Sequence, residues 1–338
     1  MTARTIPVVL LVLAALAGLG YWVARDWTTP GPLAETKTIV LPRGASTVEI
    51  AQRLGDEGVV AHPWLFLLGA AGSFDILSLK AGEYEIPAAS TPAAVADLLT
   101  SGKVVQHRLT ILEGLTSAEI VATLNGVAGL EGAIARRPAE GTLLPETYFY
   151  ALGDQRQSIL DRMRVAQAKA VDELWAGRAK DLPFDDPEEA LSLASIVEKE
   201  TGRDDERAHV AGVFLNRMRL GMPLQADPTV IYAITKGDKP LDRPLVHNDL
   251  SVESPYNTYL VKGLPPTPIA NPGLAAIKAT LRPMKTDDLY FVADGTGKHV
   301  FAKTLAEHNQ HVTELRRLQQ NQGTPKPGST VTPVPSTR

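Results

Sequence analysis

The sequence predicts an α+β protein with three parts: an N-terminal transmembrane helix, a small α+β subdomain, and a larger, mainly helical domain that carries a β-hairpin. Three observations predict this arrangement. An uncharged apolar run of nineteen residues occupies 6–24. Two strand signals flank helical segments between 37 and 89. From about 155 onward the apolar residues recur at helical spacing, with one hairpin signal near 289–301.

The composition excludes several classes of protein. The chain has 338 residues, and its 34 Lys and Arg against 38 Asp and Glu give a net charge of −4. This near-neutral balance predicts no nucleic-acid partner, because proteins that bind nucleic acid carry a basic excess. The absence of cysteine excludes disulfides, thiol catalysis and thiolate metal sites. Since 44% of the residues are hydrophobic, we expect an ordinary folded chain.

The apolar run at 6–24 is expected to be a membrane anchor. As a helix it would span roughly 28 Å, which is close to the thickness of the hydrocarbon core. Tyr21 and Trp22 lie at its far end, where aromatic rings favour the interface, and Arg4 before it predicts that the N-terminus stays inside. The alternative is a signal peptide cleaved after the small residues at 15–17. Both interpretations export the rest of the chain.

The small subdomain is predicted from two strand signals around two helices. Residues 38–41 are mainly β-branched and apolar, and residues 82–86 alternate polar and apolar side chains. Between them, Ser46 and Glu49 form a capping box that opens a short helix. A second helix is expected near 63–68.

The segments that follow carry three helix starts and one strand. Thr91, with a proline directly after it, caps one helix, and Thr116 with Glu119 forms a capping box for the next. The strand is expected between them, at 104–112. A further helix at 186–201 opens with aspartate, proline and two glutamates, which is a strong N-terminal signal.

The rest of the larger domain is expected to contain another helix and a hairpin. The helix occupies 204–220, and Gly221 is expected to be its C-cap. Two strand-like segments at 289–293 and 299–301 flank the turn sequence Asp-Gly-Thr-Gly at 294–297.

The chain therefore divides into six expected segments. The tail is rich in Pro, Thr, Ser and Gly, so we expect it to be disordered. In chain order the segments are an N-terminal tip and anchor at 1–27, a linker at 28–36, the small subdomain at 37–89, a connecting α+β region at 90–154, the mainly helical domain at 155–321, and the tail at 322–338.

Two glutamates near the end of the helix at 186–201 are candidates for acid–base chemistry. Successive residues lie about 100° apart on a helix, so Glu200 falls between Leu193 and Ile196 at the edge of the apolar stripe. A carboxyl group against apolar side chains has a raised pKa, as a general acid near neutral pH requires. Glu198 falls on the other edge, and spacing alone does not separate the two. The alternative is that both are ordinary rim residues.

Polar groups interleaved with aromatic rings predict a surface for an uncharged sugar. Sugar hydroxyls need hydrogen-bond partners, and the faces of sugar rings need apolar contacts. Each of these segments could instead be a capped turn or a core tyrosine. The candidate substrate-binding residues are Glu146, Gln225, Asp227, Thr229, Tyr232, Tyr256, Asn257 and Tyr259.

Other chemistries lack support in the sequence. No glycine-rich phosphate loop is present, because Gly295 and Gly297 belong to the expected hairpin tip. His308 and His311 are three residues apart without paired carboxylates, so we expect a solvated helix face and no metal site. Ser195 has no histidine partner near it in the sequence. We therefore expect no cofactor.

Five segments, taken in order, carry a resemblance to a known family. They are EGTLLPETYFY at 140–150, LASIVEKET at 193–201, VAGVFLNRMRLGMPLQADPTVIYAI at 210–234, YNTYLVKGLPPTPIANPG at 256–273 and LYFVADGTGKHVFAKTLAEHN at 289–309. Together with the anchor, they resemble the endolytic murein transglycosylase, or YceG-like, family over nearly all of residues 1–320. The small subdomain resembles a LysM-like sugar-binding module; the alternative is a packing domain without a ligand.

The resemblance implies a single-pass protein of the bacterial inner membrane, with its catalytic part outside the cytoplasm. Such proteins cut peptidoglycan glycan strands internally, between N-acetylmuramic acid and N-acetylglucosamine, without water, and leave a 1,6-anhydromuramic end. In their lysozyme-like domain the catalytic glutamate lies in the IVEKET motif, which corresponds to Glu200 here. Thr201 resembles the serine of a Glu-Ser pair and becomes a further candidate substrate-binding residue. The location implies peptidoglycan synthases as neighbours.

A single carboxyl group suffices for this reaction. Glu200 would protonate the glycosidic oxygen and then accept the proton of the sugar's own C6 hydroxyl as that oxygen closes onto C1. An inverting hydrolase would need a base about 6.5–9.5 Å from the acid, a position that Glu146 or Asp227 could fill. A hydrolysing muramidase and a non-catalytic wall-binding scaffold are therefore the alternatives.

Overall fold

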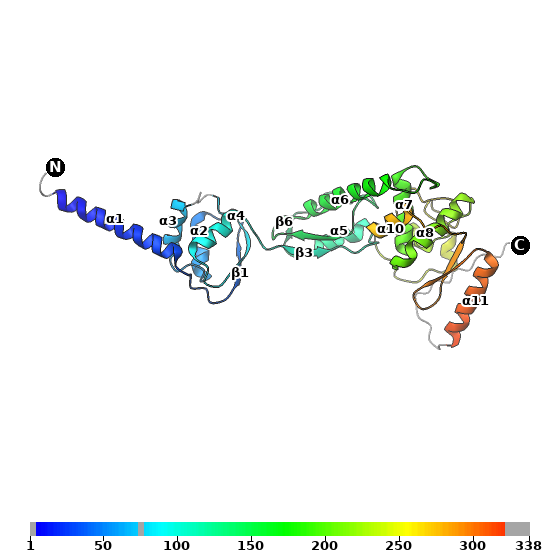
Figure 1. Ribbon diagram of the computed structural model, residues 1–338. Coiled ribbons are helices and arrows are strands. Elements are labelled where there is room, and N and C mark those ends of the chain that lie inside the picture. The colour runs from blue at the N-terminus through cyan, green and yellow to red at the C-terminus, as the bar shows by residue number, and fades with distance from the viewer. Residues whose placement is uncertain (1–4, 74–77, 322–338) are drawn as a thin grey trace. The chain divides into compact units, whose positions relative to one another are not determined.

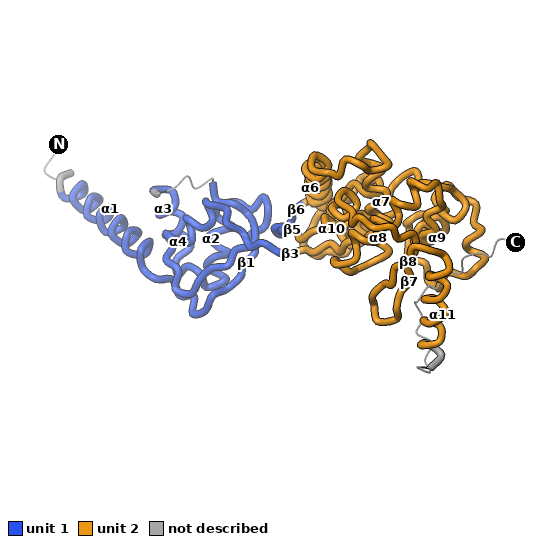
Figure 2. Tube along the Cα trace, turned by 45° about the vertical axis from the view of Figure 1, so that its right-hand side comes forward, with its two compact units in different colours: residues 1–108, 149–154 blue, residues 109–148, 155–338 orange. Residues whose placement is uncertain are grey.

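The computed structural model describes residues 5–73 and 78–321 of the chain (Figure 1). The chain forms two compact units, which Figure 2 distinguishes by colour. Unit 1 comprises Met1–Arg108 and Phe149–Asp154, and unit 2 comprises Leu109–Tyr148 and Gln155–Arg338. The tail expected to be disordered at 322–338, and Arg4 before the expected anchor, lie outside the described residues.

Helix α1, Thr5–Thr28, contains the apolar run that was expected to be an anchor. Its segment Pro7–Thr28 is long and apolar enough to cross a membrane, and in the described part of the chain no second helix meets that test. By length and composition it fits a membrane anchor or a signal sequence. The helix continues beyond the uncharged run through Arg25 and Asp26, and the small residues at 15–17 lie inside it.

The described part of unit 1 contains, besides α1, the two-stranded antiparallel sheet β1–β2 and the short helices α2, α3 and α4. The strands pair with Ile39 opposite Tyr84. The capping box expected at Ser46 and Glu49 is present, because each side chain accepts a hydrogen bond from the other residue's backbone N–H. The elements are β1 Lys37–Leu41, α2 Thr47–Asp56, α3 Pro63–Ser73, β2 Gly82–Ile86 and α4 Pro92–Ser101.

One hydrophobic core joins the elements of unit 1. Tyr84 from the sheet, Leu54 from α2, Phe66 from α3 and Leu99 from α4 are all buried in the same cluster. Helix α4 therefore packs with the small subdomain, whereas the sequence assigned it to the connecting region at 90–154. The expected β-α-α-β order is present, and its likeness to a LysM module stays a prediction.

Unit 2 is mainly helical. Because strands accompany the helices in both units, the whole fold is mixed α and β. The capping box at Thr116 and Glu119 opens α5, and Asp186 caps α7, as expected. Strand β3 pairs with β5, and β4 with β6; residues 107–108, 149–150 and 154 of these strands belong to unit 1. The remaining elements in chain order are β3 His107–Thr110, α5 Ser117–Gly126, β4 Leu130–Glu131, β5 Thr147–Tyr150, β6 Asp154–Gln155, α6 Arg156–Ala176, α7 Pro187–Glu200, α8 Asp204–Arg219, α9 Asp227–Thr235, the 3-10 helix η2 His247–Ser251, α10 Leu274–Leu281, β7 Tyr290–Ala293, β8 His299–Ala302 and α11 Leu305–Asn321.

The core of unit 2 lies between α7, α8 and α10, which contact one another (Figure 1). Leu193 and Val197 of α7, Val210 and Phe214 of α8, and Ile277 of α10 are buried in it. Each such side chain stabilises the fold by about 1.5–3 kcal/mol when it is fully buried. This cluster therefore fixes the C-terminal end of α7, where the two candidate glutamates lie.

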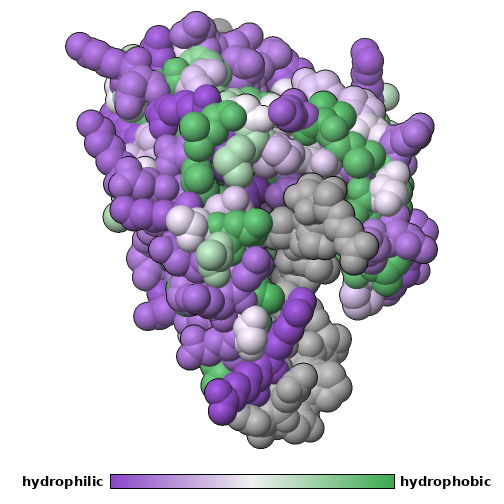
Figure 3. All heavy atoms as spheres, turned by 90° about the vertical axis from the view of Figure 1, so that its right-hand side faces the viewer, coloured by the Kyte–Doolittle hydropathy of each residue, from purple (hydrophilic) through white to green (hydrophobic). Residues whose placement is uncertain are grey.

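Strands β7 and β8 form the antiparallel hairpin that the turn at 294–297 predicted. The hairpin packs on α11 through Val292, Val312 and Leu315. That this hairpin is an insertion into a lysozyme-like domain stays a prediction. The face of the molecule seen in Figure 3 is largely hydrophilic, and its hydrophobic side chains gather in separate patches.

Three expectations from the sequence need correction. The strand expected at 104–112 is β3, which is only four residues long. The C-cap of α8 is Leu220, and Gly221 follows it with a φ of 64°. His308 does not lie on a solvated helix face: it is buried, and its ring centroid lies 5.4 Å from that of Tyr290, because the hairpin covers this side of α11.

Candidate active site

Helix α7 ends at Glu200, which places both candidate glutamates in its last turn. The next residue, Thr201, has an extended backbone with φ −140° and ψ 129°, so the helix cannot continue. A negative charge at the C-terminal end of a helix opposes the helix dipole. Each glutamate therefore needs either a compensating partner or a proton.

Glu198 has compensating partners for both of its carboxyl oxygens. Its side chain is only 4% exposed, and Oε1 accepts a hydrogen bond of 3.2 Å from Nη2 of Arg207. Oε2 accepts one of 2.9 Å from the backbone N–H of Gly273. Glu198 thus ties α7 to α8 and to the start of α10, and each of its oxygens already accepts a hydrogen bond.

Glu200 is different, because its carboxyl has no hydrogen bond or ion pair with any residue that the structure describes. The side chain is half-buried. Burial raises the pKa of Glu200 from 4.5 to about 8, with a further increase from the charge of Asp227 and an opposing decrease from Arg217. A group with this pKa is largely protonated at neutral pH and can donate a proton. Sequence spacing did not separate Glu198 from Glu200, but these two environments do.

Asp227, in the first turn of α9, is the acidic residue whose charge raises the pKa of Glu200. Burial raises the pKa of Asp227, and the hydrogen bond that Tyr259 donates to its Oδ1 at 2.6 Å lowers it. The structure therefore brings together three of the predicted site residues, Glu200, Asp227 and Tyr259.

Arg217 of α8 supplies the positive charge of this site, and the sequence interpretation missed it. The side chain is buried, and its guanidinium donates hydrogen bonds of 2.7 Å to the carbonyl of Leu289 and 2.8 Å to that of Leu224. A weaker bond of 3.4 Å reaches Oε1 of Gln225, a predicted site residue with φ 53°. Arg217 lies seven residues after Val210, so the two side chains share the buried side of α8. This spacing could have identified Arg217 as a buried residue from the sequence.

Tyr232 of α9 and Tyr256 form an aromatic pair that packs against the core of unit 2. Their ring centroids lie 4.8 Å apart and the rings are tilted by 50°. Both side chains are half-buried, and the hydroxyl of Tyr256 shares a hydrogen bond of 2.8 Å with that of Thr267. Partly exposed rings that are held in place are suited to contact with the face of a sugar.

Three predicted substrate-binding residues are buried and hold the backbone of this region. Thr229 is fully buried and donates to the carbonyl of Ala226 at 2.6 Å. Asn257 is also fully buried and donates to two backbone carbonyls of the preceding turn. Thr201 is buried, and its hydroxyl accepts from the N–H of Arg203 at 3.1 Å. These three side chains support the backbone of their loops, and their contact with a sugar stays a prediction.

Glu146 is not among the charged residues that shift the pKa of Glu200. It is exposed, and its carboxyl accepts a hydrogen bond of 3.0 Å from the N–H of Thr147. Burial and the charges of Glu198 and Glu146 raise the pKa of Glu113, while Arg207 lowers it. The charges that shift the pKa of Glu200 are Asp227 and Arg217 instead.

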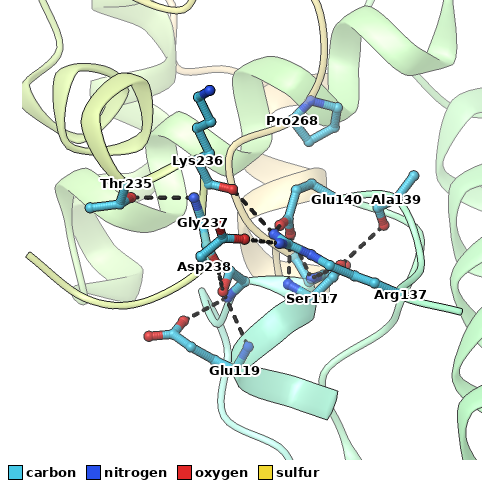
Figure 4. Close-up of polar contacts among 12 residues, drawn as sticks. Ser117, Glu119, Arg137, Ala139, Glu140, Thr235, Lys236, Gly237, Asp238 and Pro268 are labelled. Carbon is cyan, nitrogen blue, oxygen red and sulfur yellow. Dashed lines mark hydrogen bonds and ion pairs between the residues drawn. The ribbon is translucent and has the colours of Figure 1, made fainter. Parts of the chain in front are cut away.

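A polar network around the buried Glu140 holds the segment that follows α9 (Figure 4). Arg137 pairs with Glu140 at 2.8 Å and with Asp238, and it donates to the carbonyl of Lys236. Glu140 also accepts a bond of 2.7 Å from the N–H of Ser117 at the start of α5. Since α9 carries Asp227 and Tyr232, this network fixes one end of the helix that presents two site residues.

Other candidate chemistries find no support in unit 2. The hydroxyl of Ser195 is buried, donates to the carbonyl of Ser192 and accepts from the N–H of Ile269. Burial and the charge of Arg217 lower the pKa of His308. Within residues 5–73 and 78–321, no group of three His, Cys, Asp or Glu side chains is placed to hold a metal ion.

Comparison with known proteins identifies the family. A model of the YceG-like family matches residues 39–314, a span that includes every site residue named above. The chain belongs to the YceG-like family. A further match within the family is a crystal structure of a yceG-like protein from Listeria monocytogenes, at 32% identity with a TM-score of 0.47, covering 82% of this chain and 99% of that one.

Two curated relatives of this YceG-like protein share one name with each other. The "Endolytic murein transglycosylase" of Bacillus subtilis (strain 168) is 32% identical over 311 residues, which cover 81% of this chain and 83% of that protein. The protein of the same name from Streptococcus pneumoniae serotype 2 is 30% identical over 354 residues, covering 91% of this chain and 64% of that protein.

Proposed function

We propose that this chain is an endolytic murein transglycosylase. It would cut peptidoglycan glycan strands internally, between N-acetylmuramic acid and N-acetylglucosamine, and leave 1,6-anhydro ends. Membership of the YceG-like family and two relatives of that name at 30–32% identity support the activity. The pair of half-buried tyrosines near α9 supports an uncharged saccharide as the substrate.

One observation carries the assignment of the catalytic residue. Of the two glutamates in the last turn of α7, Glu198 has both oxygens engaged, whereas Glu200 is unpaired among the described residues and has a pKa raised to about 8. A transglycosylase that uses one carboxyl group needs that group protonated before the reaction and ionised during it. Glu200 meets the first requirement by burial, and the nearby guanidinium of Arg217 favours the second.

The proposed reaction uses Glu200 twice. The protonated carboxyl donates its proton to the glycosidic oxygen as the bond to C1 of the muramic acid breaks. The carboxylate then takes the proton of the C6 hydroxyl of the same sugar, whose oxygen forms the new bond to C1. No water enters, and the proton balance of Glu200 is restored. Because the nucleophile belongs to the substrate, its effective concentration is high.

The hydrolytic alternative needs a second carboxylate as a base. Asp227 is the acidic neighbour of Glu200, but its Oδ1 is held by Tyr259 and burial raises its pKa. Glu146 acts on Glu113 rather than on Glu200. Both features favour the one-carboxyl reaction over hydrolysis.

We also propose that α1 stays in the membrane as an anchor, with the rest of unit 1 and all of unit 2 outside the cytoplasm. Trp22 and Arg25 near its end are typical of a membrane interface. This location would put the enzyme beside peptidoglycan synthases. Detection of peptides from 5–24 in the mature membrane-bound protein would support the anchor, and a mature N-terminus just after 15–17 would show a cleaved signal sequence.

Product analysis tests the activity directly. The full chain in detergent is incubated with purified sacculi, and the released fragments are analysed by mass spectrometry. Anhydro ends are expected; reducing ends would show a hydrolase, and intact glycan a scaffold. Glu200→Gln should abolish the products. Glu198→Gln is the matched control, because it makes the same carboxyl-to-amide replacement two residues away, and its folded fraction should still form anhydro ends. The opposite pattern would assign the reaction to Glu198.

A further inference from the structure

Helix α3, Pro63–Ser73, has the composition of a buried helix although one side of it faces outward. Its sequence, PWLFLLGAAGS, contains no charged residue. Leu65, Phe66 and Ala70 are buried in unit 1. A helix at the surface of a soluble domain normally carries polar residues on its outer side. The outer side of α3 therefore requires an explanation that the unit's own core does not give.

The outward side of α3 is a continuous apolar stripe. Trp64 and Leu68 are 45% and 46% exposed, and Ala71 is exposed one turn later. At helical spacing these three side chains lie within about 60° of arc. Water would solvate this stripe at a cost proportional to its apolar area, so an apolar partner is favoured.

The stripe is joined to the end of α1, and Figure 1 shows the two helices in contact. The ring of Trp64 lies 5.9 Å from that of Trp22, and the ring of Phe66 lies 5.9 Å from that of Trp27. Just before α3, Nδ1 of His62 lies 2.9 Å from Oδ1 of Asp26. A Cβ on Gly69 would overlap the Trp27 ring, so the helices pack closely here. The position of α3 is thus fixed relative to the last two turns of α1.

This fixed contact determines the depth of α3 if α1 spans the bilayer. Trp22 lies fifteen residues after Pro7, the first residue of the apolar segment, or roughly 22 Å along the helix axis. The hydrocarbon core is about 30 Å thick, so a span that begins at Pro7 places Trp22 in the outer third of the core, about 8 Å from its outer boundary. Arg25, one turn later and exposed, would reach the headgroups. Trp64, which packs beside Trp22, would lie at the same level.

We infer that α3 is an interfacial helix, which inserts the stripe of Trp64, Leu68 and Ala71 into the outer boundary of the lipid bilayer beside α1. The partner is lipid rather than protein, because the stripe is continuous with the lipid-facing surface of α1 and contains tryptophan at the interfacial level. The inference rests on the proposed anchor. Its consequence is that unit 1 is held against the membrane in one orientation instead of hanging from a flexible tether.

The absence of native cysteine allows a direct test in the full chain. Leu68→Cys is labelled with an environment-sensitive fluorophore, and the protein is reconstituted into vesicles of phosphatidylethanolamine and phosphatidylglycerol. Spin-labelled lipids are then added as quenchers. Val48→Cys on α2 is the matched control, because Val48 is 49% exposed in the same unit. Leu11→Cys reports the span itself, and Ala71→Cys repeats the test if Leu68→Cys does not fold.

The expected result is a blue-shifted label at position 68 that loses most of its fluorescence to spin-labelled lipid, while the label at 48 stays in water. A label at 68 that behaves like the label at 48 would overturn the inference, provided that the label at 11 is quenched. A label at 68 that is shielded from water but not quenched by lipid would show a protein partner, which also overturns it. An unquenched label at 11 would overturn the anchor itself, and with it the interfacial helix.

Discussion

Replacing Glu200 by glutamine should stabilise unit 2 at neutral pH while it removes the activity. The folded protein raises the pKa of Glu200 from 4.5 to about 8. Between these two values the unfolded chain releases the proton and the folded chain keeps it, so ionisation favours unfolding. Each pH unit above 4.5 therefore costs the folded state about 1.36 kcal/mol. Glutamine has no proton to lose and avoids this cost.

The size of the effect follows from the pH. Glu200→Gln should be more stable than the native protein by at most about 3 kcal/mol at pH 7 and by at most about 5 kcal/mol above pH 8. Below pH 4.5 the carboxyl is protonated in both states, so the difference should vanish. The stability linked to the Glu200 proton is thus fully present below pH 4.5 and is lost as the pH rises through 8.

Hydrogen exchange of peptides from α8, followed by mass spectrometry at increasing urea, measures this stability for unit 2 alone. Both proteins are compared at the same pH, so the intrinsic exchange rates cancel. A difference that grows from pH 4.5 to pH 8 is expected. Equal stability at pH 7, or a stabilisation that does not depend on pH, would refute the reasoning, because either result means that Glu200 is not a buried acid.

Two further substitutions test the surroundings of Glu200. Asp227→Asn removes the charge that raises the pKa of Glu200, so the alkaline limb of the pH–rate profile should move down by up to about one pH unit. An unchanged limb would exclude this coupling. Glu198→Gln weakens the buried contact with Arg207 and should destabilise unit 2 by about 1–3 kcal/mol in urea unfolding. This effect is opposite in sign to that of Glu200→Gln. A variant as stable as the native protein would show that the Glu198–Arg207 pair contributes little to stability.

Helix caps and turns that are formed by residues close together in the sequence could be predicted from it. The capping boxes at Ser46 and Thr116 and the start of α7 at Asp186 are satisfied by side chains within three residues of the cap. The hairpin β7–β8 likewise follows from its own turn. Such signals are local, so no knowledge of the tertiary fold is needed to interpret them.

The distinction between the two glutamates could not be predicted in this way. It depends on Arg207 and on the backbone of Gly273, which engage Glu198 from other elements, and on Arg217, which approaches Glu200 from α8. Helical spacing places both carboxyls at the edge of an apolar stripe and gives no information on which one meets a cation. The family resemblance chose Glu200 for a different reason, the motif that contains it.

The burial of polar residues could not be predicted from the sequence pattern. Thr229 and Asn257 are polar and lie in aromatic segments, but they bond to backbone groups of their own loops and are fully buried. His308 was expected to be solvated because its helix is polar, and the hairpin that covers it comes from an earlier part of the chain. The bonds of Thr229 and Asn257 are local, whereas His308 is buried by the packing of the hairpin on α11.

The most direct test of a neutral, proton-donating Glu200 is its own titration. Infrared difference spectra between the native protein and Glu200→Gln, recorded as the pH is raised, isolate the carboxyl band of this one residue. We expect a protonated carboxyl that persists at neutral pH and disappears with a midpoint near pH 8. A midpoint near the ordinary value of 4.5 would contradict the proposed mechanism, because Glu200 would then have no proton to donate when the sugar binds.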